Sequence, residues 1–227
     1  MDRKSKKNLQ RVLYEEVDTV LFDLDGTLID SSKDIALCAN YALKKLGFEP
    51  LEEEEIIKHV GYGGENLIKG IIPIKDPEVI AQAVNLFRQH YYSNPVVYTQ
   101  PFEYIPDILK ILKDKGKKLA VITNKYEDIS KQILKRLNLY NFFDFIAGGD
   151  TFKSKKPDPE PIKKTLEILN AQNSIIIGDS EADINAGKNA GIKTCLVMYG
   201  FGKEEKIREL RPDFKIEKPK DLYEVLS

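Results

Sequence analysis

The chain alternates between short continuous apolar runs and longer segments with hydrophobic residues at helical spacing. Apolar runs rich in β-branched residues are typical of strands buried on both faces of a parallel sheet. Strands are predicted near residues 17–25, 118–123, 142–147, 174–178, 194–198 and 214–216. Beyond residue 101, helices are predicted at 104–115, 127–138, 159–169, 181–190, 203–211 and near Leu222. This alternation predicts an α/β fold, a Rossmann-like doubly wound parallel sheet with helices on both faces.

The stretch between the first two predicted strands is too long for a simple crossover, which needs only about 30 residues. It contains helical patterns at 52–59, 65–72 and 77–92, and no strand pattern. An earlier helix is predicted to start at a capping box formed by Ser31 and Asp34. We therefore expect an inserted α-helical cap domain at residues 31–100, lying over the site. The core domain would comprise residues 17–30 and 101–227, after an N-terminal extension of residues 1–16.

Two aspartates end the first predicted strand, in the string D-L-D-G-T-L-I-D-S. A spacing of two residues places the carboxylates of Asp23 and Asp25 on the same face of the strand end. Gly26 permits a sharp turn directly after them. Two carboxylates this close need a cation or a proton to relieve their repulsion. A strand-ending Asx turn is the structural alternative, whereas an EF-hand calcium loop would need a further ligand before its glycine.

The second predicted strand ends in Thr123 and Asn124. Ligands of open α/β sheets bind outside the carboxyl ends of the strands, so these residues are candidate site residues. Thr123 would offer its hydroxyl and an exposed backbone N–H to a phosphate oxygen. The structural alternative for Thr123 is the N-cap of the following helix.

A lysine cluster and two further aspartates follow the next two strands. Pro157 fixes the local backbone directly after Lys156, which would aim one ammonium in a set direction. Composition alone does not decide whether Lys155 or Lys156 is the site lysine. Asp179 and Asp183 lie four residues apart at the start of a predicted helix, where either could instead be a simple cap.

In chain order, D-x-D-x-T, T-N, K-P and G-D-S-x-x-D resemble motifs I to IV of the haloacid dehalogenase (HAD) superfamily of phosphatases. The resemblance implies that Asp23 is a nucleophile forming an aspartyl-phosphate. It implies that Asp25 is the general acid/base, supported by Thr27. Thr123 and Lys156 would stabilise the phosphoryl oxygens, and Thr27 and Asn124 would also lie near the phosphate.

Clustered carboxylates favour a hard cation with oxygen ligands, and Mg²⁺ suits a phosphate substrate. Both histidines fall in the predicted cap, so a zinc site or a Ser-His-Asp triad is not supported. The resemblance supplies the ligands, namely the carboxylates of Asp23 and Asp179 and the backbone carbonyl of Asp25. Asp183, with Ser180 beside it, would orient Lys156 or a metal-bound water from outside the ligand shell.

Within the superfamily, the chain looks most like the phosphoglycolate phosphatases, through D-L-D-G-T-L-I-D-S, T-N-K, K-P-D-P-E-P and the helical insertion. One departure is Tyr104-Ile105-Pro106, where those enzymes usually carry Tyr-Pro-Gly. The implied function is a Mg²⁺-dependent phosphomonoester hydrolase acting on a small phosphorylated metabolite, with 2-phosphoglycolate as the preferred substrate. The alternatives are a phosphatase for pyrophosphate, a nucleotide or a sugar phosphate, a phosphomutase, and a non-catalytic binding protein.

The cap should supply contacts to the leaving group. The candidate is the loop Gly61-Tyr62-Gly63-Gly64, which does not match the dinucleotide pattern G-x-G-x-x-G. A plain turn between two helices is the alternative for this loop.

Charge and composition indicate an ordinary globular protein. With 35 basic and 36 acidic residues the net charge is -1, which gives no sign of a nucleic-acid or membrane partner. Cys38 and Cys195 lie far apart among apolar residues and are predicted to be core residues. No apolar run approaches the roughly 18 residues of a membrane helix, and no secretory signal pattern is present, so a cytoplasmic location is expected. A monomer and a homodimer both remain open.

Overall fold

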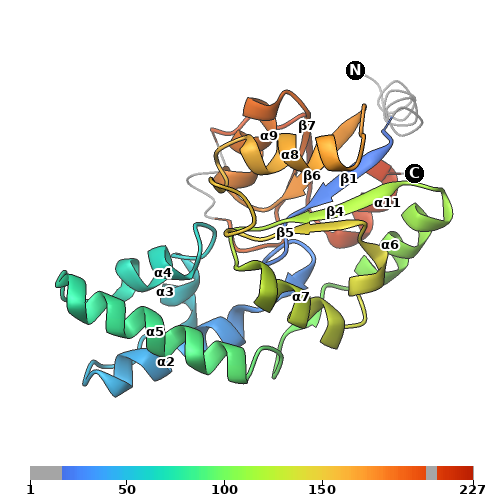
Figure 1. The fold of residues 1–227 in the computed structure, drawn as a ribbon. Helices are drawn as coiled ribbons and strands as arrows, with labels where there is room; N and C mark the ends of the chain where they lie inside the picture. Colours follow the sequence, from blue (N-terminus) through green and yellow to red (C-terminus); the bar gives the residue numbers. More distant parts are fainter. Residues whose placement is uncertain (1–16, 203–208, 227) are drawn as a thin grey trace.

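A six-stranded parallel sheet forms the centre of the computed structural model, which describes residues 17–202 and 209–226 (Figure 1). The strand order is β5-β4-β1-β6-β7-β8, and every neighbouring pair is parallel. The strands are β1 (Thr19–Phe22), β4 (Lys118–Ile122), β5 (Phe145–Ala147), β6 (Ser174–Gly178), β7 (Lys193–Val197) and β8 (Phe214–Ile216). The predicted extension at residues 1–16, and residues 203–208 of a predicted helix, lie outside the described residues.

Helices cover both faces of the sheet, as the alternating pattern predicts. Leu21 of β1 packs in one cluster with residues of α8 (Glu160–Ile168) and α9 (Glu181–Ala190). Its neighbours Val20 and Phe22 pack toward α6 (Ile105–Asp114), α7 (Glu127–Arg136) and α11 (Leu222–Leu226). Two short 3₁₀ helices, Tyr140–Phe142 and Pro219–Asp221, complete these connections. The doubly wound fold is thus confirmed, with β1 buried on both faces.

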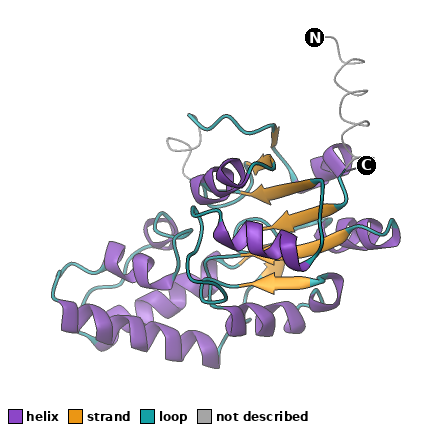
Figure 2. Ribbon diagram, turned by 45° about the horizontal axis from the view of Figure 1, so that its top comes forward, coloured by secondary structure: helices purple, strands orange, loops and turns teal. Residues whose placement is uncertain are grey.

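Four helices lie apart from the sheet, beside the carboxyl ends of its strands (Figures 1 and 2). They are α2 (Ser32–Lys45), α3 (Glu53–Ile57), α4 (Gly64–Ile71) and α5 (Pro77–Ser93). We call residues 32–93 the cap. The start of α5 is encoded locally, because the Asp76 side chain accepts bonds from the N–H groups of Glu78 and Val79, and Pro77 opens the first turn.

A two-residue ribbon joins the cap to the core, where the sequence pattern predicted no strand. Strand β2 (Ile29–Asp30) pairs antiparallel with β3 (Gln100–Pro101), so the outgoing and returning chains lie side by side. Two residues are too few to show a strand period in the sequence. The pairing forms only when folding brings together two segments that are distant in the chain.

The predicted capping box at Ser31 and Asp34 is wrong. Helix α2 has no side-chain cap at Ser31, whose hydroxyl instead donates to Oδ1 of Asp25 at 2.6 Å. The buried Asp34 carboxylate accepts hydrogen bonds from the backbone N–H groups of residues 97–99 and from the Thr99 hydroxyl. Both side chains serve tertiary contacts that a local motif cannot reveal.

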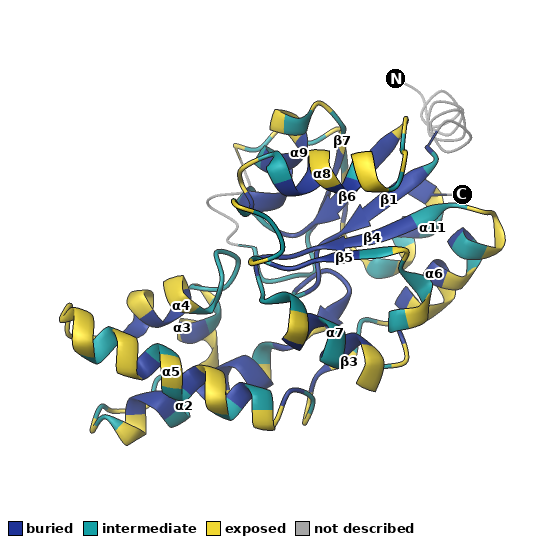
Figure 3. Cartoon of the chain, viewed as in Figure 1, coloured by how far each residue is buried: buried dark blue, intermediate teal, exposed yellow. Residues whose placement is uncertain are grey.

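Burial follows the division into core and cap (Figure 3). Buried residues fill the sheet and the inner sides of the cap helices, while exposed residues mark the outer helix faces. Both cysteines are free and buried, as predicted for core residues. Within the described part of the chain, we find no helix with the length and apolar character needed to cross a bilayer.

Candidate active site

Three buried aspartates meet at the carboxyl ends of the central strands. Asp23 follows β1, Asp179 follows β6, and Asp183 lies in the first turn of α9. One carboxylate oxygen of each lies within 4.8 Å of the other two. Because β1 and β6 are adjacent parallel strands, their ends bring together residues from opposite halves of the chain.

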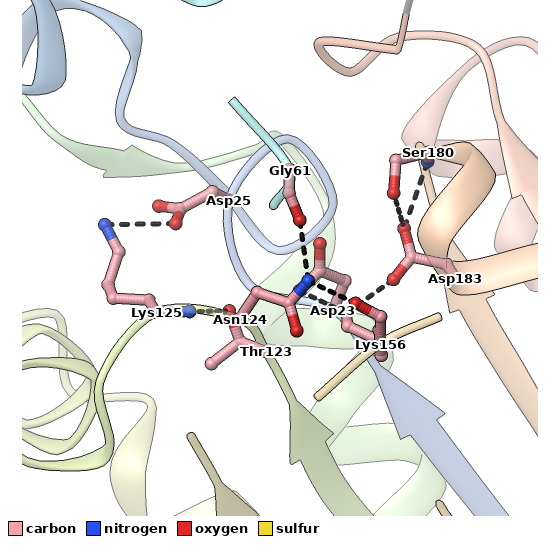
Figure 4. Close-up of polar contacts among 9 residues, drawn as sticks. All are labelled: Asp23, Asp25, Gly61, Thr123, Asn124, Lys125, Lys156, Ser180 and Asp183. Atoms are coloured by element: carbon pink, nitrogen blue, oxygen red, sulfur yellow. Dashed lines mark hydrogen bonds and ion pairs between the residues drawn. The ribbon is translucent and has the colours of Figure 1, made fainter. Parts of the chain in front are cut away.

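Lys156 is the lysine that enters this cluster. Its Nζ lies 2.8 Å from Oδ1 of Asp23 and 2.5 Å from Oδ1 of Asp183, and its side chain is only 2% exposed. Lys155 points elsewhere, and its ammonium donates to the backbone carbonyl of Tyr62 at 3.1 Å. The geometry therefore separates two lysines that composition could not distinguish. Figure 4 shows Lys156 beside Asp23 and Asp183.

The cluster carries more negative charge than Lys156 can balance. Burial, together with the charge of Asp183, raises the pKa of Asp23 to about 7, although Lys156 opposes the shift. Burial, together with the charges of Asp183 and Asp23, also raises the pKa of Asp179 well above its ordinary value. A group of buried oxygen ligands with uncompensated charge, and no sulfur or imidazole among them, fits Mg²⁺.

The backbone around Asp179 is shaped closely to its carboxylate. Oδ2 of Asp179 accepts a hydrogen bond from the backbone N–H of Phe201 at 2.6 Å. Gly26 has a φ of +78°, and a Cβ there would come within 2.3 Å of the same oxygen. A side chain at position 26 would therefore be strained and would displace Asp179, which is why this turn needs glycine.

Asp25 also faces the site but binds a different set of partners. Its Oδ1 accepts the Ser31 hydroxyl at 2.6 Å, and its Oδ2 lies 3.0 Å from Nζ of Lys125. The Thr27 hydroxyl, predicted to support Asp25, is buried without a hydrogen-bond partner among the described residues. Ser31, and not Thr27, donates a side-chain hydrogen bond to Asp25 among the contacts of the described residues.

Sequence reasoning missed Lys125 and Tyr91. Lys125 donates to the Tyr91 hydroxyl at 2.7 Å, joining the core to helix α5 of the cap. Burial would lower the pKa of Lys125, but the charge of Asp25 and the bond to Tyr91 outweigh it and raise that pKa. The available signal for Lys125 was its place directly after Thr123 and Asn124 at a strand end, whereas nothing local marks Tyr91.

The backbone N–H of Thr123, expected to be exposed for a phosphate, donates to the Ala147 carbonyl of β5 at 2.9 Å, so that expectation is wrong. The N-cap alternative is also wrong, because the residue before α7 is Tyr126. The Thr123 hydroxyl accepts from the backbone N–H of Lys125 at 3.2 Å and keeps its proton available for donation. Of the two expected donors, the hydroxyl alone remains.

Asn124 connects three parts of the site. Its amide nitrogen donates to the carbonyl of Gly61 in the cap at 2.8 Å and to that of Lys156 at 2.9 Å. Its amide oxygen is buried without a partner among the described residues. Both amide hydrogens are therefore already used, so these contacts give no support to direct phosphate binding by this side-chain nitrogen.

The two carboxylate oxygens of Asp183 have different partners. Its Oδ2 accepts from the backbone N–H of Ser180 at 3.0 Å and from the Ser180 hydroxyl at 2.5 Å. Its Oδ1 holds Lys156. One oxygen therefore bonds to Ser180, the N-cap residue of α9, and the other reaches into the aspartate cluster.

The loop Gly61–Gly64 crosses from the cap to the core. The Tyr62 hydroxyl donates to Oε2 of Glu181 in α9 at 3.2 Å. Gly63 has a φ of +90°, and a Cβ there would lie 3.0 Å from the Asn124 carbonyl oxygen. Together with the bonds from Asn124 and Lys155, these contacts hold the loop against the core, which a plain turn within the cap would not require.

A cavity of about 470 Å³ lies between the cap and the carboxyl ends of the strands. Asp23, Asp25 and Asp179 line its core side together with Thr123 and Lys125, and the loop at 61–64 lines its cap side. A phosphorylated metabolite would therefore meet the carboxylates on one side and cap residues on the other.

The model of the family described as haloacid dehalogenase-like hydrolase matches residues 20–197. The chain belongs to the haloacid dehalogenase-like hydrolases. It is 48% identical over 210 residues to a phosphoglycolate phosphatase of Aquifex aeolicus, covering 92% of this chain and 96% of the relative. It is 32% identical over 214 residues to a pyrophosphatase of Halalkalibacterium halodurans, covering 93% and 98%.

A solved structure shares this architecture. The crystal structure of a predicted phosphoglycolate phosphatase from Haemophilus somnus superimposes with a TM-score of 0.89 at 25% identity, covering 93% of this chain and 99% of that one. The family that the four motifs predicted is confirmed. The predicted Rossmann-like fold is confirmed as well.

Proposed function

We propose that this HAD hydrolase is a Mg²⁺-dependent phosphomonoesterase that acts through an aspartyl-phosphate, with 2-phosphoglycolate as its preferred substrate. The observation that carries the proposal is the buried cluster of Asp23, Asp179 and Asp183 around Lys156, beside a cavity large enough for a small metabolite. The phosphoglycolate phosphatase at 48% identity supports the choice of substrate.

Asp23 is the nucleophile in this proposal. Its carboxylate attacks phosphorus, a bond forms between its oxygen and phosphorus, and the bond to the leaving oxygen breaks. Lys156 orients Asp23 from 2.8 Å and stabilises negative charge on the transferred group. Mg²⁺ held by Asp23 and Asp179 and by the carbonyl of Asp25 would neutralise phosphate charge.

Asp25 is the general acid and base. It gives its proton to the leaving alkoxide, and later takes one from the water that hydrolyses the aspartyl-phosphate. Positioned proton transfer of this kind contributes roughly 100- to 10,000-fold in rate. Ser31 and Lys125 hold its two oxygens, so the carboxyl group has a defined orientation toward the cavity.

The cap excludes water and recognises the leaving group. The contacts of the loop at 61–64 with Asn124, Lys155 and Glu181 support a closed arrangement over the cavity. We also propose that the cap and its two junctions, residues 31–100, form a helical cap domain. We further propose that the enzyme acts in the cytoplasm as a monomer or homodimer.

Turnover of a panel of phosphate esters tests the substrate. The panel contains 2-phosphoglycolate, pyrophosphate, a nucleoside monophosphate and a sugar phosphate, with kcat/KM measured for each. We expect the highest value for 2-phosphoglycolate. Pyrophosphate is the second candidate, because a pyrophosphatase is 32% identical to this chain, and a higher kcat/KM for pyrophosphate would overturn the assignment.

A further inference from the structure

Lys125 lies between a core carboxylate and a cap hydroxyl. Its Nζ is 3.0 Å from Oδ2 of Asp25, and it donates to the Tyr91 hydroxyl at 2.7 Å. The ammonium also lies 4.4 Å from the centre of the Tyr91 ring, within the range of a cation–π contact. The side chains of Lys125 and Asp25 are 9% and 11% exposed, so this contact is largely shielded from water.

Each oxygen of Asp25 has its own partner, and both partners are tied to the cap. Ser31, which holds Oδ1, directly precedes helix α2. Lys125, which holds Oδ2, belongs to the core but is bonded to Tyr91 near the end of α5. The plane of the Asp25 carboxyl group is therefore set by contacts that reach both long helices of the cap.

Stability alone is a poor explanation for this arrangement. Burying a carboxylate and an ammonium carries a desolvation cost that their attraction often only offsets, so such a pair is weak evidence for a stabilising role. A lysine also loses considerable side-chain entropy when it is held in one conformation. Both groups line the cavity, where orientation of a reacting carboxyl group has direct consequences.

We infer that Lys125 is a positioning residue for Asp25 and that Tyr91 makes this positioning depend on the cap. The inference rests on the proposed function, in which Asp25 protonates the leaving group. With the cap on the core, Tyr91 holds the flexible lysine stem and Lys125 fixes Asp25. When the cap moves away, Lys125 loses the hydroxyl and the ring, and Asp25 loses its fixed orientation.

The test uses two esters of similar shape that differ in how much acid assistance they need. Phenyl phosphate has a poor leaving group, whereas 4-nitrophenyl phosphate has a good one. Values of kcat/KM are compared, because this ratio reports the step in which the leaving group departs and excludes later hydrolysis of the aspartyl-phosphate. The variants are Lys125→Met, Lys125→Arg and Tyr91→Phe.

We expect Lys125→Met to lower kcat/KM for phenyl phosphate by roughly 100-fold and for 4-nitrophenyl phosphate by less than about 10-fold. Lys125→Arg should recover much of the loss, because it restores a cation beside Asp25. Tyr91→Phe should show the same selectivity at a few-fold scale. It removes a single hydroxyl and keeps the ring, so the test survives if Lys125→Met does not fold.

Tyr92→Phe is the matched control. Tyr92 neighbours Tyr91 in α5, and its hydroxyl also reaches the core, where it donates to Asp128. It has no bond to Lys125 or Asp25 among the contacts of the described residues. If Tyr92→Phe loosens the cap, it should therefore lower kcat/KM for both esters by the same factor, without the selectivity expected for Tyr91→Phe.

Three results would overturn the inference. Equal losses on both esters in Lys125→Met and Tyr91→Phe would mean a structural role. A rise in KM at unchanged kcat would mean that Lys125 binds substrate directly. If wild-type protein hydrolyses neither ester nor any ester of the panel, the proposed function itself fails, and that result is distinct from the first two.

Discussion

Nζ of Lys156 lies 2.8 Å from Oδ1 of Asp23, and both side chains are buried. The same ammonium lies 2.5 Å from Asp183, so one cation is shared by two carboxylates from different elements. A third carboxylate, that of Asp179, belongs to the same cluster. This excess of buried negative charge underlies the first three predictions.

Asp23→Asn should abolish turnover, with a loss of roughly 10,000-fold or more, because the amide oxygen is a poor nucleophile. Folding should persist, since the substitution removes a carboxylate charge that burial and the neighbouring carboxylates already disfavour. Incubation with ³²P-labelled substrate followed by acid quench should label wild-type protein and leave the variant unlabelled. Substantial turnover in a variant preparation free of wild-type enzyme would contradict the role of Asp23.

Activity should require Mg²⁺, be partly supported by Mn²⁺ or Co²⁺, and be inhibited by Ca²⁺. Calcium accepts a larger and looser set of oxygen ligands, so it can engage both oxygens of Asp23 and hinder attack. Assays after chelation, with each ion added back, check this prediction. Independently of turnover, Mg²⁺ should raise the Tm of wild-type protein more than that of Asp179→Asn. Full activity in excess chelator would exclude the proposed metal site.

Lys156→Met should be far more damaging than Lys155→Met. Removing one partner of a buried ion pair costs about 3–5 kcal/mol, because the remaining charges are left uncompensated. Lys155 lies one residue away and contacts a backbone carbonyl, which makes it a matched control. Denaturant unfolding and kcat measured on both variants test the difference. Equal effects of the two substitutions would contradict the assignment of Lys156.

Tyr62→Ala should lower kcat/KM for the true substrate, and kcat should fall with it. Binding energy from the cap that is used for closure appears in the transition state, so its loss affects both parameters. An aryl phosphate with a good leaving group should be affected much less.

Tyr62→Phe separates the ring from the hydroxyl that donates to Glu181. If the hydroxyl bond holds the loop, Tyr62→Phe should reproduce part of the loss. No effect of Tyr62→Ala on either substrate would return the loop at 61–64 to a plain turn.

Asp34→Asn should destabilise the junction of cap and core by about 1–3 kcal/mol at neutral pH, because backbone N–H groups lose their charged acceptor. Burial alone would raise the pKa of Asp34, but the hydrogen bonds from Thr99 and its neighbours lower it below 3.8. A lowered pKa means that the stabilisation is present above the unfolded value and is lost as pH falls through the folded one.

The Tm difference between wild type and Asp34→Asn should therefore be constant near pH 7 and shrink below about pH 5. Asp30→Asn is the control, since the Asp30 carboxylate is exposed and accepts one backbone N–H from Ser32. A Tm difference for Asp34→Asn that does not change between pH 7 and pH 3 would contradict this account.

The sequence alone predicted most of the core. Strand β6 and helix α9 were placed at their observed bounds, because a continuous apolar run and an amphipathic helix are local patterns. Four motifs at strand ends predicted the family, since parallel strands bring their carboxyl ends to one edge. The same logic predicted that Asp23 and Asp179 would lie close together, and they do.

Tertiary structure alone decided which partner each polar side chain takes. Ser31 and Asp34 match a capping box, yet Ser31 bonds to Asp25 and Asp34 holds residues 97–99. The ribbon of β2 and β3 and the link between Lys125 and Tyr91 likewise join segments that are distant in the chain. A buried polar group must find a partner, and local sequence does not specify which distant group folding brings within reach.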